Sequence, residues 1–224
     1  MFVGWHMTRN PVTVSPDTPL PSAREIMEKK GFSHLPVVDD KGRLCGIITD
    51  RDIKKAWASP ATTLSVYEFT YLLGRLKVSA VMTRDVITAH PGTSVERAAW
   101  MLRRHKIGAL PVVDDRNQVV GILTVSDLLD LILLATGMTE DSARLLLLVG
   151  DRTGTMADVG RILQQAGINM RSALTVTLPD HPGVWQLIIR VNMAAKEPAA
   201  RALEEAGYRV LTHYVEDLSP FLSE

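Results

Sequence analysis

Two short segments of the chain each place a threonine and an aspartate three positions apart. Thr49 precedes Asp52 and Thr124 precedes Asp127, each pair directly after a Gly-hydrophobic-hydrophobic run. We expect each threonine at a strand-to-helix junction, where free backbone N–H groups and the helix dipole favour an anion such as a phosphate. One helical turn on, the aspartate carboxylate can accept both hydroxyls of a ribose. The same spacing also fits a plain helix cap.

Both pairs belong to an internal repeat. Shifted by 75 positions, the sequence aligns with itself without a gap from residue 7 to residue 53, so that Met7-Thr8-Arg9 falls on Met82-Thr83-Arg84. The run Leu35-Pro36-Val37-Val38-Asp39-Asp40 falls on Leu110-Pro111-Val112-Val113-Asp114-Asp115. A constant offset over runs of this length indicates duplication of one structural unit.

Each copy predicts the order β-α-β-β-α. For the first copy we expect a strand at Val12–Val14, a helix capped by Ser22, strands Leu35–Val38 and Arg43–Ile48 joined by a turn, and a helix from Thr49 to Ala56. For the second copy we expect a strand at Val86–Thr88, a helix capped by Ser94, the same hairpin, and a helix from Thr124 to Leu134. A unit of about 50 residues has too little core alone, so the two copies should pack together. Residues 61–77 are expected to form a helical connector.

The repeated pattern of Met-Thr, hydrophobic-Pro-Val-Val-Asp and Gly-hydrophobic-hydrophobic-Thr-x-x-Asp resembles the CBS domain, present twice as a CBS pair (a Bateman module). The resemblance assigns residues 1–60 and 78–136 to the two domains. It implies clefts between them that bind adenosine-containing ligands: AMP, ADP, ATP, S-adenosylmethionine or, in some members, NAD. The residues expected at these nucleotide sites are Thr13, His34, Leu35, Pro36, Thr49, Arg51, Asp52, Thr88, Ala109, Leu110, Pro111, Thr124, Ser126 and Asp127.

The two expected sites differ in charge. Arg51 lies between Thr49 and Asp52, whereas the matching position holds the uncharged Ser126, and His34 matches Ala109. We therefore expect the cleft around Thr49, Arg51 and Asp52 to prefer the more phosphorylated ligand. The alternative is an Arg51 that is simply solvated.

After Gly137 the repeat ends and a different pattern begins. It predicts a strand at Leu145–Val149, a helix at Met156–Ala166 closed by Gly167, strands at Ile168–Leu178 and Val184–Asn192, a helix at Glu197–Ala206 and a strand at Tyr208–Glu216. The order βαββαβ is the ferredoxin-like split arrangement. The chain as a whole is thus expected to be an α/β (α+β) protein.

Within this region, Asp151-x-x-Gly154-x-Met156 followed by Gly167-Ile168-Asn169 resembles the ACT domain over about residues 143–217. That resemblance implies a regulatory module, a homodimer, and an amino-acid site at Asp151, Gly154, Met156 and Asn169. The alternative is a domain that only dimerises, with Asn169 only capping a turn. A CBS pair followed by an ACT domain is similar to the acetoin utilisation accessory protein family.

Composition narrows the function classes. Lys+Arg and Asp+Glu are both 25, so no net positive charge points to nucleic acid. No apolar run approaches the roughly 20 residues of a membrane span, and Cys45 is the single cysteine, so we expect a cytoplasmic protein without membrane insertion. The six histidines show no metal-ligand spacing, and the sequence has no nucleophile elbow or phosphate-binding Gly-Lys-Thr loop.

These observations predict a non-catalytic sensor that requires no cofactor. Nucleotide binding between the CBS units would favour one arrangement of the chain, which the ACT domain or a regulated protein partner would detect. The rival hypothesis is a structural or scaffold subunit whose clefts stay empty.

Overall fold

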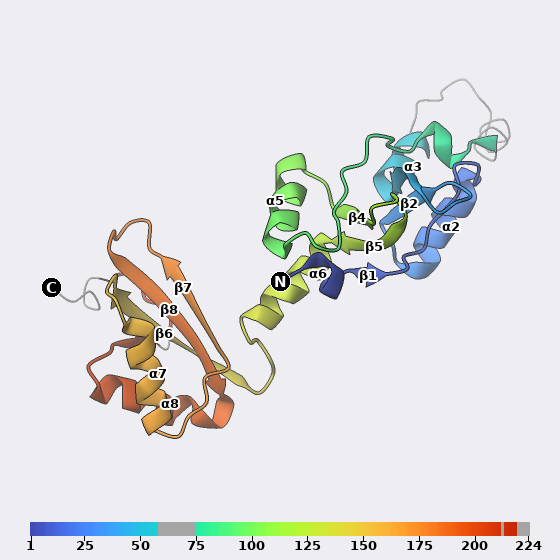
Figure 1. The fold of residues 1–224 in the computed structure, drawn as a ribbon. Coiled ribbons are helices and arrows are strands. Elements are labelled where there is room, and N and C mark those ends of the chain that lie inside the picture. Colours follow the sequence, from blue (N-terminus) through green and yellow to red (C-terminus); the bar gives the residue numbers. More distant parts are fainter. Residues whose placement is uncertain (58–74, 212, 219–224) are drawn as a thin grey trace. The chain divides into compact units, whose positions relative to one another are not determined.

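The computed structural model describes residues 1–57, 75–211 and 213–218. The chain divides into two compact units, Met1–Leu129 and Asp130–Glu224 (Figure 1). Most of the connector helix expected at 61–77 lies outside the described residues.

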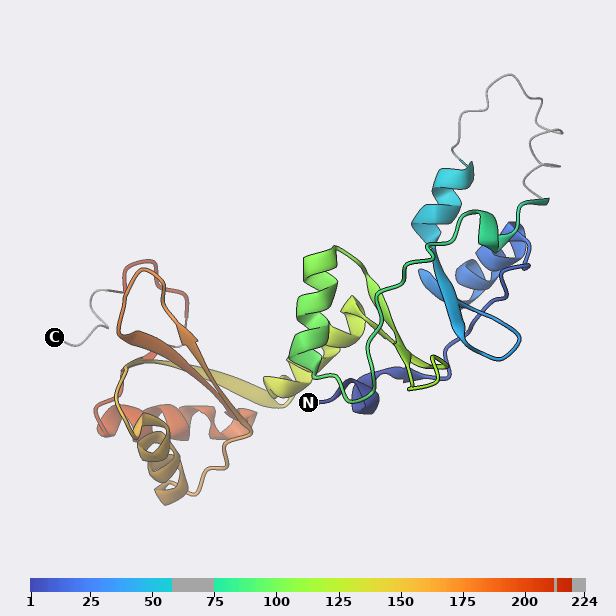
Figure 2. The same ribbon diagram turned by 45° about the horizontal axis from the view of Figure 1, so that its top comes forward.

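The first unit holds the two repeats, each a hairpin with a helix before it and a helix after it (Figure 2). The hairpins are antiparallel, and the register shifts at the same place in both, between Val37 and Val38 and between Val112 and Val113. The elements of the first repeat are α2 (Leu20–Lys30), β2 (His34–Val38), β3 (Leu44–Thr49) and α3 (Asp50–Trp57). Those of the second are α5 (Val95–His105), β4 (Ala109–Val113), β5 (Val119–Thr124) and α6 (Val125–Ala135), whose last six residues belong to the second unit.

Two details of the predicted repeat are wrong. The strands expected at Val12–Val14 and Val86–Thr88 are reduced to single parallel bridges, Val14 with Val37 and Ala89 with Val112. A proline two residues later, which has no N–H to donate, stops each pairing.

The second wrong detail is the cap at Ser22. The helix α2 begins at Leu20, and its N-cap residue is Pro19, so Ser22 lies inside the first turn. The repeat offset places Pro19 where the second copy has Ser94. Ser94 caps α5 as predicted, since its side chain accepts a hydrogen bond from the Arg97 N–H at 3.1 Å.

Each repeat is completed by the segment that leads into the other repeat, an exchange that the sequence analysis did not predict. The N-terminal segment forms α1 (Val3–His6) and β1 (Thr8–Arg9), and β1 pairs antiparallel with β5 of the second repeat. Correspondingly, Thr83 pairs with Ile47 of the first repeat, after the 3-10 helix η1 (Val78–Ala80). Val78 is fully buried in the core of the first repeat.

This exchange explains a glycine in each hairpin. A Cβ on Gly46 would lie 2.6 Å from the Met82 sulfur, and a Cβ on Gly121 would collide with the Met7 sulfur. The Met-Thr motif and the glycine of the Gly-hydrophobic-hydrophobic motif are therefore two halves of one packing contact.

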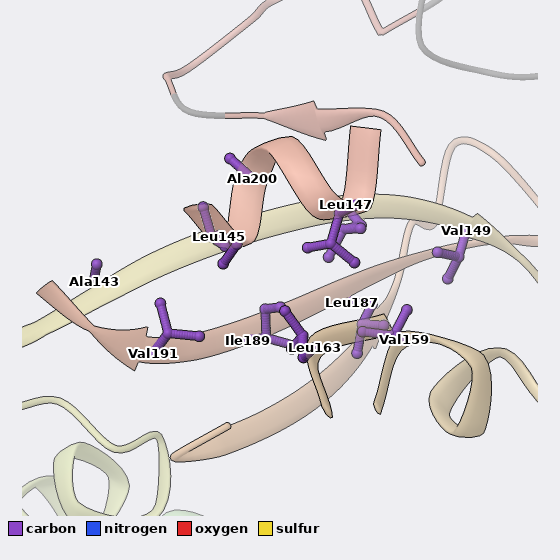
Figure 3. Packing of buried hydrophobic residues seen from close by; sticks show 12 residues of the cluster. Ala143, Leu145, Leu147, Val149, Val159, Leu163, Leu187, Ile189, Val191 and Ala200 are labelled. Atoms are coloured by element: carbon purple, nitrogen blue, oxygen red, sulfur yellow. The ribbon is translucent and has the colours of Figure 1, made fainter. Parts of the chain in front are cut away.

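The second unit has the predicted order βαββαβ. Its elements are β6 (Ser142–Gly150), α7 (Thr155–Gln165), β7 (Ser172–Thr177), β8 (Val184–Asn192), the 3-10 helix η2 (Met193–Ala195), α8 (Lys196–Glu205) and β9 (Val210–Leu211). The antiparallel sheet has the order β7-β8-β6-β9, which is the ferredoxin-like arrangement. Alternate residues of β6 and β8, among them Leu145, Leu147 and Ile189, pack against Val159 and Leu163 of α7 (Figure 3).

Two strands of this unit are shorter than predicted, for the same reason. The strand expected at Ile168–Leu178 starts at Ser172, and the strand expected at Tyr208–Glu216 is limited to Val210–Leu211 within the described residues. Ile168 and Tyr208 each donate their N–H back into the preceding helix, to Leu163 at 2.8 Å and Leu203 at 2.9 Å. The residues after each helix thus complete its C-terminal turn before a strand can begin.

Candidate functional site

Thr49 and Asp52 are bound to each other at the start of α3. The Asp52 Oδ2 accepts hydrogen bonds from the Thr49 hydroxyl at 2.6 Å and from the Thr49 N–H at 3.0 Å. In return the Asp52 N–H donates to the Thr49 hydroxyl oxygen at 3.2 Å. This reciprocal arrangement is a capping box, which fixes both side chains at the helix N-terminus.

The second repeat builds the same geometry. Asp127 Oδ2 accepts from the Thr124 hydroxyl at 2.8 Å and from its N–H at 2.7 Å. Both threonine–aspartate pairs therefore form helix caps, as the alternative interpretation predicted. The cap does not use the whole carboxylate: among the described residues, the hydrogen bonds that both aspartate side chains accept go to Oδ2, and Oδ1 accepts none.

A cavity of about 460 Å³ opens at the first of these helix starts. We call it the Thr49 cavity. Five predicted residues line it: His34, Thr49, Arg51, Asp52 and Ala109. Its other lining residues are Ile47, Asp50, Lys55, Thr83, Asp85, Val86, Ile87, Lys106, Ile107 and Gly108.

Both repeats contribute to this cavity because of the exchanged segment. Ile47 and Thr83 exchange two backbone hydrogen bonds of 2.9 Å, which bring residues 83–87 beside the start of α3. The loop after α5 supplies the opposite wall, with Lys106 in the left-handed conformation (φ +54°) that ends the helix. Lys106 takes the place that Gly31 has in the first repeat.

The charges of the Thr49 cavity are mixed. Arg51, Lys55 and Lys106 are its basic residues, and Asp50, Asp52 and Asp85 its acidic ones. Asp50 is engaged by Lys54 at 2.9 Å, and this hydrogen bond holds the pKa of Asp50 below its usual range. The cavity can therefore offer cations to a phosphate, and the Asp52 carboxylate can accept hydrogen bonds from hydroxyl groups.

His34 lies half-buried against the second repeat. A Cβ on Gly108 would lie 2.8 Å from the His34 Nε2, so only a glycine leaves room for the imidazole. Burial lowers the pKa of His34, although Asp50 and Asp52 act in the opposite direction. The ring is consequently neutral near pH 7 and can accept as well as donate a hydrogen bond.

The remaining predicted nucleotide residues lie elsewhere. Leu35 and Leu110 are fully buried, and Pro36 and Pro111 are buried beside them in β2 and β4. Their side chains belong to the interior rather than to the Thr49 cavity. The backbone oxygens of Pro36 and Pro111 accept from the Val14 and Ala89 N–H groups.

Five more predicted residues also lie outside this lining. Thr13 and Thr88 are half-buried in the loops before the bridging residues Val14 and Ala89. Thr124, Ser126 and Asp127 stand at the start of α6.

Sequence reasoning missed Lys55, Thr83, Asp85 and Lys106. Thr83 could have been found from the sequence, because it belongs to the repeated Met-Thr motif. Lys106 had no such signal, since its role depends on contact between two repeats.

The predicted amino-acid residues of the second unit lie on exposed positions around α7. Asp151 and Gly154 precede the helix, Met156 is in its first turn, and Asn169 follows its end. Gly154 is the N-cap residue with φ +93°, a conformation that requires glycine.

Over residues 1–57, 75–211 and 213–218, no helix is both long and apolar enough to cross a membrane. Nor do the residues in these ranges gather three or more His, Cys, Asp or Glu side chains as a metal site.

Comparison with known sequences identifies the repeats. The CBS domain profile matches residues 3–59 and 78–134, half of the chain. A homoserine O-acetyltransferase of Methanococcoides burtonii is 36% identical over 122 residues, which cover 54% of this chain and 22% of the enzyme. A CBS domain-containing protein of Dictyostelium discoideum is 36% identical over 57% of this chain and 88% of its own length. The segment that this chain matches in the homoserine O-acetyltransferase is thus about a fifth of that enzyme's length.

Solved structures cover the same part of the chain. The CBS domain pair of protein MJ0100, in complex with 5′-methylthioadenosine and S-adenosyl-L-methionine, is 34% identical over 59% of this chain and 95% of its own, with a TM-score of 0.51. A protein assigned to acetoin utilization (AcuB) from Vibrio cholerae is 31% identical over 62% and 98%, with a TM-score of 0.53. CBSX2 of Arabidopsis thaliana, in complex with AMP, is 30% identical over 59% and 96%, with a TM-score of 0.50.

Proposed function

Since this chain belongs to the CBS domain family, we propose that it is a non-catalytic regulatory protein that binds an adenosine-type nucleotide in the Thr49 cavity. The observation that carries the proposal is the composition of this cavity, whose walls come from both repeats. A ligand held there contacts both repeats at once, so binding favours one arrangement of the pair over others. The adenosine ligands of the MJ0100 and CBSX2 pairs support this ligand class.

We assign each part of such a ligand a partner among the residues that line the cavity. The open Oδ1 of Asp52 can accept ribose hydroxyls while Oδ2 keeps the helix cap. Arg51 and Lys106, from different repeats, can pair with phosphate oxygens. The apolar side chains Val86 and Ile87 provide a surface for a flat base. We therefore expect AMP, ADP or ATP to bind here in preference to S-adenosylmethionine.

A thermal-shift screen of the full chain tests the proposal. AMP, ADP, ATP, S-adenosylmethionine and NAD are compared with the matching guanosine nucleotides. A ligand at about 100 times its Kd stabilises the folded state by about 2.7 kcal/mol, which moves the melting temperature by several degrees. No shift with any adenosine compound would favour the rival scaffold function, in which the threonine–aspartate pairs are only helix caps.

We also propose that the second unit is an ACT domain that joins two copies of the chain. Its sheet ends in β7, an edge strand whose Leu174 and Val176 are 44% and 40% exposed. An edge strand leaves one row of backbone N–H and C=O groups unpaired, and such a row is a template for pairing with another strand. Sedimentation of a Leu174→Lys, Val176→Lys variant should show a monomer where the native chain shows a dimer, and an unchanged dimer would refute this interface.

An amino-acid ligand at Asp151, Gly154, Met156 and Asn169 stays part of the same proposal, and amino acids belong in the thermal-shift screen. A regulated partner protein would detect the bound state. The single cysteine, Cys45, supports a cytoplasmic location.

A further inference from the structure

A second cavity, of about 610 Å³, lies within the second unit. We call it the Arg161 cavity. It is formed by the end of β6, one side of α7 and the turn between α8 and β9. Its lining is Leu148, Val149, Gly150, Arg152, Thr155, Asp158, Arg161, Ile162, Gln165, Ala206, Gly207, Tyr208 and Arg209. None of the four residues expected at the amino-acid site is among them.

Positive charge dominates this cavity. Arg152, Arg161 and Arg209 reach it from the loop before α7, from α7 itself and from the segment before β9, and Asp158 is the single carboxylate in its lining, which leaves an excess of two positive charges. Asp158 holds two of the guanidinium groups, Arg152 at 2.9 Å through Oδ2 and Arg161 at 3.1 Å through Oδ1. Arg152 also donates to the Tyr208 hydroxyl oxygen at 3.1 Å.

These contacts arrange donors without exhausting them. A guanidinium carries five N–H donors in a planar fork, and Asp158 takes one from each of its two arginines. The Tyr208 hydroxyl accepts from Arg152, so its own proton is available to a ligand. Gly150 and Gly207 leave open space where a Cβ would stand.

We propose that the Arg161 cavity binds the phosphate monoester group of a small metabolite. A phosphate monoester near neutral pH carries up to two negative charges and several acceptor oxygens, which match the charge excess and the guanidinium forks. Asp158 holds Arg152 and Arg161 beside the cavity, while its own negative charge opposes that of the ligand. The site is independent of the nucleotide proposed for the first unit.

Calorimetric titration of the full chain with methyl phosphate tests this proposal. We expect one binding event per chain that weakens about tenfold or more in Arg161→Gln and in Arg209→Gln, because each loses a charged hydrogen-bond donor. Arg201→Gln, which removes an exposed arginine of α8 outside the lining, is the matched control and should bind like the native chain. Asp158→Asn should bind more tightly, since it removes the competing carboxylate.

The contrary outcomes are distinct. Absence of binding at millimolar methyl phosphate would overturn the proposal, as would equal weakening in the Arg201→Gln control. Binding that is lost in Arg51→Gln instead would place the phosphate in the Thr49 cavity, which also overturns it. Tighter binding of succinate with the same arginine dependence would replace the phosphate monoester with a dicarboxylate. Thermal unfolding of each variant identifies those that fail to fold, and Asp158→Asn then decides, because a purely structural network predicts no gain in affinity.

Discussion

Asp52 combines a structural and a proposed binding role, and two substitutions separate them. Its Oδ2 accepts two hydrogen bonds from Thr49, whereas Oδ1 faces no partner among the described residues. Asparagine keeps one carbonyl oxygen, which can replace Oδ2 in the cap, but it puts an NH2 donor where Oδ1 was. Alanine removes both oxygens. The pair of variants therefore distinguishes loss of the cap from loss of the ligand.

The cost of the cap follows from known helix N-termini. Removing an N-cap contact costs about 0.5–2 kcal/mol of stability, which corresponds to a fall of a few degrees in melting temperature. Asp52→Ala should show this fall and Asp52→Asn only a small part of it. Asp127→Ala removes the equivalent contacts with Thr124 and should destabilise by a similar amount. It serves as the matched control, since Asp127 does not line the Thr49 cavity.

The nucleotide Kd should separate these variants in a different way from their stability. Hydrogen bonds to a charged group contribute about 1.5–3 kcal/mol, so both Asp52 variants should raise the Kd about 10- to 150-fold in calorimetric titration. Asp127→Ala should leave that Kd nearly unchanged. Native affinity in Asp52→Asn would refute the reasoning, because it would reduce Asp52 to a helix cap. Equal weakening in Asp127→Ala would show that the effect comes from helix stability.

Three further outcomes are expected. Lys106→Ala should weaken ATP binding about two- to fivefold and affect adenosine little, while Lys30→Ala, which removes an exposed lysine at the end of α2 outside the cavity lining, should change neither in calorimetry. Gly46→Ala should lower the free energy of unfolding by about 1–3 kcal/mol because its Cβ meets the Met82 sulfur, and Met82→Ala should cost less in that background than in the native chain when both are measured by urea titration. Burial lowers the pKa of His34, so the unfolded chain binds this proton more tightly and stability should fall below about pH 6.5; His34→Ala should lose that part of the pH dependence.

The repeat and its elements could be predicted because they depend on local pattern. The hairpins, the helices after them and the cap at Ser94 each depend on neighbouring residues in sequence. Local pattern also explains the errors: Pro19 had replaced the cap in the first repeat, and the late start of β7 depends on how the preceding helix ends.

The candidate site was predicted only as far as it is local. Thr49 and Asp52 are three residues apart, so the spacing alone predicts that they meet at the helix start. The opposite wall of the cavity comes from residues 83–87 and 106–109, which reach it through the exchange between repeats. No periodicity in a single sequence predicts that a segment leading into one repeat pairs with the other. The packing contact between Gly46 and Met82 can be recognised only from the structure, in which that exchange is visible.

Duplication produces two similar helix starts, and sequence divergence gives them different chemistry. The Thr49 cavity has Arg51 and Lys106 where the repeat offset gives Ser126 and Gly31. The carboxylate that would meet a ribose persists in both repeats, whereas the cations that would meet a phosphate are present only at the Thr49 cavity. Because an unpaired phosphate loses its charge-assisted hydrogen bonds, a nucleotide polyphosphate should select the Thr49 cavity. A nucleoside ligand without phosphate is the kind of molecule to which the equivalent helix start at Thr124 is better suited.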